Sequence, residues 1–261
     1  MRIYAVSDLH ADFRENRRLL ERIPTGEHRG DVLIVAGDVA DQLPLVAEVL
    51  GGLRERFAEL FFVPGNHELW VRAEPRDSVE KFHAVLAACA GVGVRTAPAR
   101  VGGAWVVPLF SWYDPAFDVL GEADHESLEA WSDRYFCRWP PGPPPVELFL
   151  AMNEPWLRGY DAPVVSFSHF VPRTELVPAV RWLRFKGLPL VAGSVAIDAQ
   201  VRRVGASVHV FGHTHIAEDR TIDGVRYVQN HLRAAGSGDG GLLKLVWSDE
   251  PRGWSTGPLF A

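Results

Sequence analysis

The sequence has few cysteines and no long apolar run, and each shortage argues against a class of protein. Its two cysteines, Cys89 and Cys137, lie far apart and form no CxxC pair, which argues against a disulfide framework and a thiolate zinc site. The longest uncharged apolar stretch, residues 187–197, is far shorter than the roughly 18–20 residues that cross a bilayer. Residues 1–8 contain no apolar segment of signal-peptide length. We therefore expect a cytoplasmic protein that does not interact with membranes.

Basic charge is also in short supply. The chain has 27 lysines and arginines against 33 aspartates and glutamates, so its formal net charge is −6. This balance provides no general attraction for nucleic acid, and we do not expect nucleic acid as a partner. With 47% hydrophobic and 23% charged residues in 261, the composition is that of a globular protein. We predict a single domain over residues 1–261, and the composition does not indicate an oligomeric state.

Short runs rich in β-branched and aromatic residues recur along the chain and predict strands. Helical patterns of apolar residues follow the first two of these runs, near residues 19–23 and 45–53. This alternation of strand and helix predicts a layered α/β core. The predicted strands are residues 3–6, 32–36, 60–63, 105–109, 164–168, 208–211, 225–228 and 242–247. The last two are interpreted as an antiparallel, hairpin-like pair.

The middle of the chain, about residues 111–160, breaks this alternation. It combines four tryptophans, many acidic residues and a proline-rich stretch at 140–145. We interpret the segment as an aromatic- and proline-rich insertion that forms a cap. A polyproline recognition strip is the alternative interpretation of the prolines.

Potential metal ligands follow five of the predicted strands. Ligand sites in open α/β sheets lie beyond the C-terminal ends of the strands, so we expect these residues to converge. The segments are Asp8-Leu9-His10, Gly37-Asp38-Val39-Ala40-Asp41, Gly65-Asn66-His67-Glu68, Ser168-His169 and Gly212-His213-Thr214-His215. Aspartate, asparagine and histidine together suit a transition metal rather than calcium. The spacing of Asp8 and His10, and of His213 and His215, predicts that each pair shares one face of an extended segment.

The number of candidate ligands exceeds the need of one four-coordinate ion and favours two ions that share a carboxylate. The candidates are Asp8, His10, Asp38, Asn66, His169, His213 and His215. Two ions bring about +4, and two aspartates with a hydroxide return about −3, which leaves positive charge for an anionic phosphate. The donor atoms do not decide among manganese, iron and zinc. The alternative is that these residues only cap strand ends and shape loops.

These motifs, in this order, resemble the calcineurin-like metallophosphoesterase superfamily, whose pattern is DxH, GDxxD, GNH[ED], a lone histidine and GHxH. The match spans residues 8–215. The resemblance implies a four-layer α/β/β/α sandwich. It also implies one metal ion on Asp8, His10, Asp38 and His215. A second ion is implied on Asp38, Asn66, His169 and His213, with Asp38 as the bridge.

In this superfamily the histidine at the position of His67 stays off the metals and stabilises the transition state or protonates the leaving oxygen. The resemblance therefore implies a dinuclear metal-dependent phosphoesterase in which a metal-bridging hydroxide attacks phosphorus, with His67 and Asp38 as catalytic residues. We expect a small-molecule substrate, of nucleotide type, and leave monoester or diester open. A protein-binding scaffold of the same fold is the alternative, but the retained ligand positions and His67 disfavour it.

Some residues near the motifs are weaker candidates. Four are considered for substrate contact: Arg233, His231, Trp112 and Tyr113. The two aromatics are candidates for stacking on a base or sugar, and packing within the cap is the alternative. Asp41 and Glu68 either orient a ligand or cap a helix. His209 lies within a predicted strand, on the face opposite its valine neighbours, and we expect it to be a core or surface residue.

Overall fold

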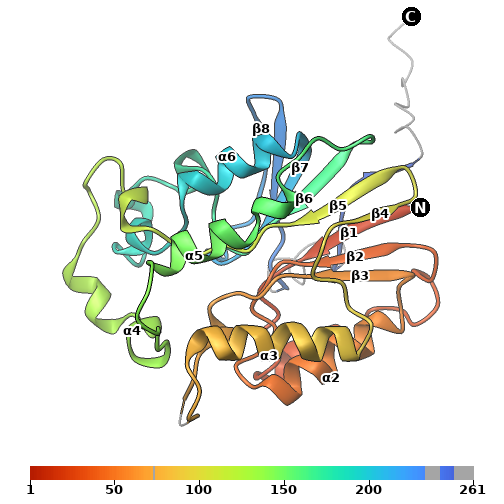
Figure 1. Cartoon of the computed structure of the whole chain (residues 1–261), viewed down its shortest axis with the longest axis horizontal. Helices are drawn as coiled ribbons and strands as arrows, with labels where there is room; N and C mark the ends of the chain where they lie inside the picture. The colour runs from red at the N-terminus through yellow and green to blue at the C-terminus, as the bar shows by residue number, and fades with distance from the viewer. Residues whose placement is uncertain (73, 233–241, 250–261) are drawn as a thin grey trace, which may run out of the picture.

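The computed structural model describes residues 1–72, 74–232 and 242–249 and contains two mixed β-sheets (Figure 1). The smaller sheet has the strand order β10 (Lys244–Ser248), β1 (Arg2–Val6), β2 (Val32–Val35) and β3 (Glu59–Phe62). The larger has the order β4 (Ala99–Val101), β5 (Ala104–Pro108), β6 (Val164–Phe167), β7 (Ala206–Phe211), β9 (Val225–Gln229) and β8 (Glu218–Ile222). The predicted α/β class is confirmed.

Helices cover the outer faces of both sheets. Figure 1 shows α2 (Leu43–Arg54) and α3 (Ser78–Gly91) outside the smaller sheet, and α5 (Pro145–Met152) and α6 (Val195–Arg203) outside the larger one. Leu20 of α1 (Arg14–Glu21) packs in the same core as α2. The short α4 (Asp133–Phe136) lies at one end of the molecule. No helix in the described part of the chain is both long and apolar enough to cross a membrane.

Short 3₁₀ helices occupy several connections. Their described positions are η1 (His67–Leu69), η2 (Pro115–Phe117), η3 (Glu126–Ala130), η4 (Glu154–Trp156), η5 (Thr174–Leu176), η6 (Val180–Trp182) and η7 (Leu188–Leu190). Such turns are usually brief because their hydrogen-bond geometry is poorer than that of an α-helix. Most of them lie in the two long connections on either side of β6, which together supply much of the chain around the candidate site.

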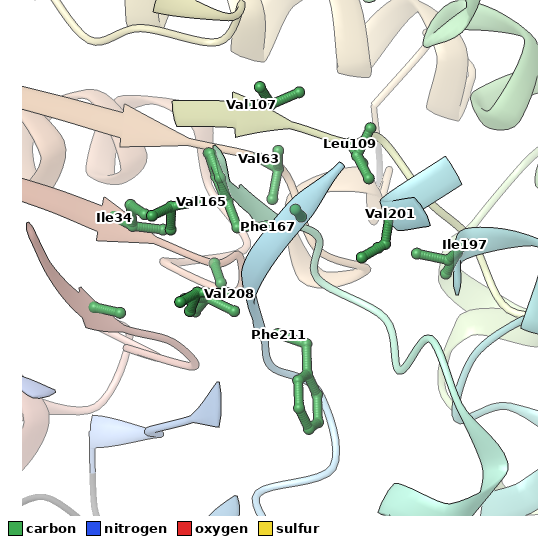
Figure 2. Close-up of a cluster of buried hydrophobic side chains, with 14 of the residues drawn as sticks. Ile34, Val63, Val107, Leu109, Val165, Phe167, Ile197, Val201, Val208 and Phe211 are labelled. Carbon is green, nitrogen blue, oxygen red and sulfur yellow. The ribbon is translucent and has the colours of Figure 1, made fainter. Parts of the chain in front are cut away.

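The strands of the smaller sheet divide their side chains between two cores, because successive residues of a strand point to opposite faces. In β2, Ile34 packs between the sheets, whereas Leu33 packs against the helices. Figure 2 shows Ile34 in the first core together with Val165 and Phe167 of β6 and Val208 of β7. Burial of these apolar side chains on both sheets holds the two sheets together.

Parallel pairing brings the strand ends to one side of the molecule. Strands β1, β2 and β3 are parallel, and so are β5, β6, β7 and β9. Antiparallel partners occur at the margins, where β10, β4 and β8 lie. The C-terminal ends of the parallel strands therefore lie at a common edge in each sheet, as the argument from sequence requires.

The predicted pairing of residues 225–228 with 242–247 is wrong. Strand β9 lies in the larger sheet, between β7 and β8, whereas β10 pairs with β1 in the smaller sheet. The antiparallel partner of β9 is β8. The sequence does not predict β8 as a strand, because its residues are mostly polar and lie at the edge of the sheet. Asp223 and Gly224 join the two strands with positive φ angles of 47° and 83°, and an Asp-Gly turn of this kind is a strong hairpin signal.

The 111–160 segment does not form one uniform layer. Trp112 and Phe149 are buried in the core of the larger sheet, so α5 belongs to the body of the fold. Pro145 is the first residue of α5, a position where proline fits because its missing N–H has no helical partner. By contrast, α4 lies away from the sheets (Figure 1).

The core between the sheets makes a direct prediction. Phe167 is 0% exposed, so Phe167→Ala should lower the free energy of unfolding by about 3–5 kcal/mol through lost burial and the cavity left behind. Val119 is 63% exposed, and Val119→Ala should change the free energy of unfolding by no more than about 0.5 kcal/mol. Urea unfolding followed by circular dichroism measures both values. Equal effects in the two variants would contradict the assignment of Phe167 to the core.

Candidate metal centre

The predicted ligands from five strands meet at one place in the structure. Asp8 and His10 follow β1, Asp38 follows β2, and Asn66 follows β3 in the smaller sheet. The larger sheet contributes His169 after β6, and His213 and His215 after β7. All seven are buried except His215. We call these seven residues the ligand cluster.

The backbone of the ligand cluster is left-handed at five positions. The φ angles of Asp8, His10, Asp38, His213 and His215 lie between 41° and 75°. The extended conformation predicted for the two paired motifs is therefore wrong. Left-handed residues turn the chain back on itself at a cost of about 1 kcal/mol or more each. The turns are held by backbone bonds between neighbouring loops, such as Asp8 N–H to Gly37 O at 3.0 Å.

One group of ligand atoms lies around the side chains of Asp8, His10 and His215. The Nε2 atoms of His10 and His215 are 3.0 Å apart, and His215 Nε2 is 3.3 Å from Asp8 Oδ1. Burial alone would raise the pKa of Asp8, but the neighbouring imidazoles of His215 and His169 outweigh it and lower that pKa. The carboxylate therefore stays ionised.

A second group lies around Asp38, Asn66, His169 and His213. The Nε2 of His169 is 3.2 Å from Nδ1 of His213, and Asn66 Oδ1 is 3.2 and 3.1 Å from these two nitrogens. Asp38 Oδ2 is 3.4 Å from His169 Nε2 and 3.9 Å from Nε2 of His10. Asp38 thus lies between the two groups. Burial would raise its pKa, but the facing histidines hold it well below the usual range.

Outer hydrogen bonds fix the orientation of the two buried imidazoles. His169 Nδ1 lies 2.8 Å from the carbonyl of Ala36, and His213 Nε2 lies 2.9 Å from the carbonyl of Val191. Each contact requires N–H at that nitrogen, so the other nitrogen of each ring faces the common point. Imidazole nitrogens this close need a proton or a cation between them. Tetrahedral zinc with Zn–N of 2.0–2.1 Å places its ligand atoms about 3.3 Å apart, so the donor set fits a metal ion.

Glu68 holds the loop that carries Asp38. Its carboxylate, 0% exposed, accepts backbone N–H bonds from Asp38, Val39, Ala40 and Gly65 at 2.6–3.1 Å. Burial, with repulsion from Asp38, raises the pKa of Glu68 to about 7, while bonds from Gly65 and Ala40 act in the opposite direction. Of the two roles considered from sequence, orientation of a ligand or capping of a helix, these bonds favour the first, because Glu68 orders the backbone that carries Asp38.

His67 lies at the edge of the ligand cluster. Its Nδ1 is 2.8 Å from Asp41 Oδ1, and its Nε2 is 3.9 Å from Asp38 Oδ2. Burial lowers the pKa of His67, but the carboxylates of Asp38 and Asp41 outweigh it and raise this pKa to about 9. The ring packs against Trp70 with centroids 3.8 Å apart. Asp41 therefore orients His67, so that Nε2 lies on the side of the ligand cluster.

Two cavities border the ligand cluster. The larger, about 700 Å³, has the cluster on one side and Trp131, Trp182, Phe185 and Leu188 among its other lining residues. The smaller, about 280 Å³, is lined by Phe13, Asn16 and His231 as well as by cluster residues. His10, His67 and His215 line both cavities. The centre is thus accessible from two hollows that meet at the same histidines.

The family model described as calcineurin-like phosphoesterase matches residues 1–217, from β1 through the GHTH motif. The chain belongs to the calcineurin-like phosphoesterase family. The predicted superfamily and the predicted phosphoester hydrolase are both confirmed. For this family the clustered histidines and aspartates of the centre imply metal ions.

Two comparisons concern one mycobacterial protein. The [acyl-carrier-protein] phosphodiesterase PptH of Mycobacterium tuberculosis is 29% identical to this phosphoesterase over 258 residues, 86% of this chain and 75% of that protein. The crystal structure of phosphopantetheinyl hydrolase PptH from the same organism has 27% sequence identity and a TM-score of 0.80. The structural match covers 95% of this chain and 96% of that chain, so the likeness includes the segments outside the family motifs.

The weaker substrate candidates lie in different places. His231 lines the smaller cavity and stacks on His215 at 5.5 Å between centroids. Trp112 is 4% exposed and packs against Trp139 and Phe170 in the core, as the packing alternative describes. Tyr113 lines a separate cavity of about 560 Å³ together with Trp112. Stacking of these two aromatics on a substrate at the metal centre is therefore not supported. Arg233 lies outside the described residues.

His209 and Asp133 complete the surroundings. His209 is fully buried, and its two ring nitrogens contact the hydroxyls of Ser166 and Ser168 at 2.8 and 3.1 Å, which makes it a core residue.

Asp133 was missed from the sequence, where it contributed only to the acidic composition of the insertion. Its Oδ1 accepts a hydrogen bond from Asn66 Nδ2 at 2.9 Å. No local pattern signals this contact, because the two residues are 67 positions apart.

The close packing around Asp38 makes a second prediction. A Cβ at Gly65 would lie 2.2 Å from Asp38 Oδ1 and 2.8 Å from the ring of His169. Gly65→Ala should therefore displace both side chains and weaken Mn²⁺ binding about 10–100-fold, as disturbance of ligand supports commonly does. Calorimetric titration of metal-free protein with Mn²⁺ measures this. In Gly52→Ala, the control, the new Cβ meets nothing within 4 Å, so affinity should stay at the wild-type value; equal affinities in both variants would contradict the prediction.

Proposed function

We propose that the protein is a two-metal phosphodiesterase. The observation that carries this proposal is the pair of cavities that meet at His10, His67 and His215. A phosphodiester has two organic substituents on phosphorus, and each cavity offers space for one. A monoester has one substituent and would leave the second cavity to water. The arrangement therefore favours the diester over the monoester, a choice that the motifs left open.

The residues of the ligand cluster divide naturally into two metal positions. Asp8, His10 and His215 would hold one ion, Asn66, His169 and His213 the other, and Asp38 both. Such ions, when bound, neutralise phosphate charge and lower the pKa of water. Manganese, iron and zinc all suit these donors. Retention of the whole donor set argues against a scaffold without catalysis.

His67 supplies the proton that the leaving oxygen needs. The carboxylate of Asp41 accepts from Nδ1 at 2.8 Å, which directs Nε2 toward the cluster. The carboxylates of Asp38 and Asp41 outweigh burial and raise its pKa to about 9, which favours the protonated form of the ring. A positioned acid of this kind typically contributes 10²–10⁴-fold to the rate. Trp70 covers one face of His67 and limits its contact with water.

We further propose that the substrate is a phosphopantetheine-type diester carried on a protein. The similar mycobacterial protein is named as a phosphodiesterase of acyl-carrier protein. In this chain, Trp182 lines the larger cavity and is 74% exposed, with Arg181 stacked over its ring at 5.5 Å. An exposed tryptophan with an arginine is a common protein-contact feature. A free small-molecule substrate, as expected from the sequence, is the alternative.

Part of the 111–160 insertion contributes to this substrate site. Trp131 lines the larger cavity and stacks on Phe185, with centroids 5.3 Å apart and an interplanar angle of 8°. We propose that the cap consists of the part of the insertion around Trp131 and α4, rather than the whole segment. The aromatic pair provides a flat apolar wall against which an extended organic arm can pack.

The choice between ester classes is tested with matched nitrophenyl substrates. In the presence of Mn²⁺, bis(p-nitrophenyl) phosphate should be hydrolysed with kcat/KM at least about tenfold above p-nitrophenyl phosphate, a difference of about 1.4 kcal/mol in transition-state binding. Asp38→Asn should lose both activities together with bound metal. A preference for the monoester in the wild-type enzyme would reject the diesterase assignment.

The role of His67 is tested by His67→Gln. The variant should retain two bound ions but hydrolyse an alkyl phosphodiester about 10²–10⁴-fold more slowly, because the alkoxide leaving group needs a proton. The loss should be much smaller with bis(p-nitrophenyl) phosphate, whose leaving group is stable as an anion. Stopped-assay kinetics with both substrates and metal analysis make the comparison. An equal fall in the hydrolysis rate with the two substrates would contradict the role of His67 as the acid that protonates the leaving oxygen.

The protein-borne substrate is tested by mass spectrometry of a holo acyl-carrier protein incubated with the enzyme and Mn²⁺. The expected product is the apo protein with free phosphopantetheine. Arg181→Glu should raise KM for the carrier protein roughly tenfold and leave bis(p-nitrophenyl) phosphate hydrolysis unchanged, because Arg181 does not line the cavity. Arg29→Glu, at an exposed position before β2, is the control. An active diesterase that leaves the holo carrier intact would favour the free small-molecule substrate.

A further inference from the structure

One buried carboxylate of the insertion is bonded to side chains in three parts of the centre. Asp133, in α4, is 3% exposed. Its Oδ1 accepts from Asn66 Nδ2 at 2.9 Å and from Trp70 Nε1 at 2.6 Å, and its Oδ2 accepts from Trp131 Nε1 at 3.0 Å. All three donors are neutral N–H groups. Together these three donors hold the carboxylate in one orientation.

The bond to Asn66 decides which atom of its amide faces the metal position. An amide carries an acceptor oxygen and a donor nitrogen, and only the oxygen can bind a cation. Because Nδ2 donates to Asp133, Oδ1 faces His169 Nε2 and His213 Nδ1 at 3.2 and 3.1 Å. With the amide reversed, N–H groups would occupy this place. Asp133 therefore selects the orientation of Asn66 that suits a ligand.

The other two bonds place rings that border the reacting groups. Trp70, held by Asp133, packs on His67 with centroids 3.8 Å apart. Trp131, held by the other oxygen, forms a wall of the larger cavity and meets His213 edge-on at 5.8 Å. The same carboxylate thus contacts a candidate ligand, the support of the candidate acid and the cavity wall.

We propose that Asp133 is a positioning residue that presents the Asn66 oxygen to the second metal position and ties the cap to the metal centre. The proposal rests on the proposed two-metal function. It predicts a selective effect of losing the Asp133 acceptor. The affinity for the ion at the position of Asn66, His169 and His213 falls. The affinity for the ion at the position of Asp8, His10 and His215 does not change. A purely structural role would lower stability without separating the two affinities.

The test is calorimetric titration of metal-free protein with Mn²⁺. Asp133→Ala removes the acceptor of Asn66 and should weaken one of the two binding events about 10–100-fold, the usual effect of losing a partner that orients a ligand, and leave the other unchanged. Glu129→Ala removes a carboxylate at an exposed position of the insertion and should leave both events unchanged. Two wild-type affinities in a folded Asp133→Ala protein would overturn the proposal.

A rescue experiment separates positioning from folding. The conservative variant Asp133→Asn keeps one acceptor oxygen, which can still accept from Asn66 Nδ2 and Trp70 Nε1 and loses only the bond from Trp131. It should retain both ion affinities to within a few-fold of wild type. If Asp133→Ala does not fold, Asp133→Asn is the decisive protein: when folded but with one of the two affinities lost, it overturns the proposal. Wild-type protein that binds two ions but cleaves no diester would instead reject the proposed function and leave the titration result intact.

Discussion

A single buried carboxylate organises the backbone on which the metal centre depends. Glu68 accepts N–H bonds from three successive residues of the Asp38 loop and from Gly65 of the next loop. These loops follow neighbouring parallel strands, and binding their amides to one carboxyl group fixes the distance between them. The side chains of Asp38 and Asn66 extend from the two loops joined in this way. Because Glu68 is fully buried, loss of these donors would leave its oxygens unsatisfied at a cost in free energy, so the four hydrogen bonds and the loop conformation stabilise each other.

The chain is acidic overall, yet its centre is suited to an anionic phosphoester, and the local structure of the centre explains how both can hold. The net charge of −6 gives an anionic substrate no general attraction. The ligand cluster gathers two carboxylates and four imidazoles around one point, where bound metal ions would supply the positive charge. Recognition of phosphate is thus a property of one buried point and does not require a basic surface.

The motifs allowed the convergence of the ligands to be predicted, because residues that directly follow parallel strands lie at the same edge of a sheet. The antiparallel partner of β9 was not predicted, since polar edge residues such as Asp219 and Arg220 carry no alternating pattern. The left-handed turns at Asp8 and His215 were also missed, because spacing alone gives an extended chain. The role of Asp133 could not be found from local sequence, because it depends on contacts with Asn66 and Trp70, which lie far away along the chain.

The left-handed backbone restricts what the centre can become. Asparagine, aspartate and histidine adopt positive φ more readily than other residues with side chains, and branched or bulky residues do so at high cost. At Asp8, His10, Asp38, His213 and His215, the conformation therefore limits the choice of side chain independently of the metal. Replacing such a ligand by a longer carboxylate or a thiolate changes both the coordinating atom and the stability of the turn. Exchange of one metal preference for another is consequently easier through the outer partners of the ligands than through the ligands themselves.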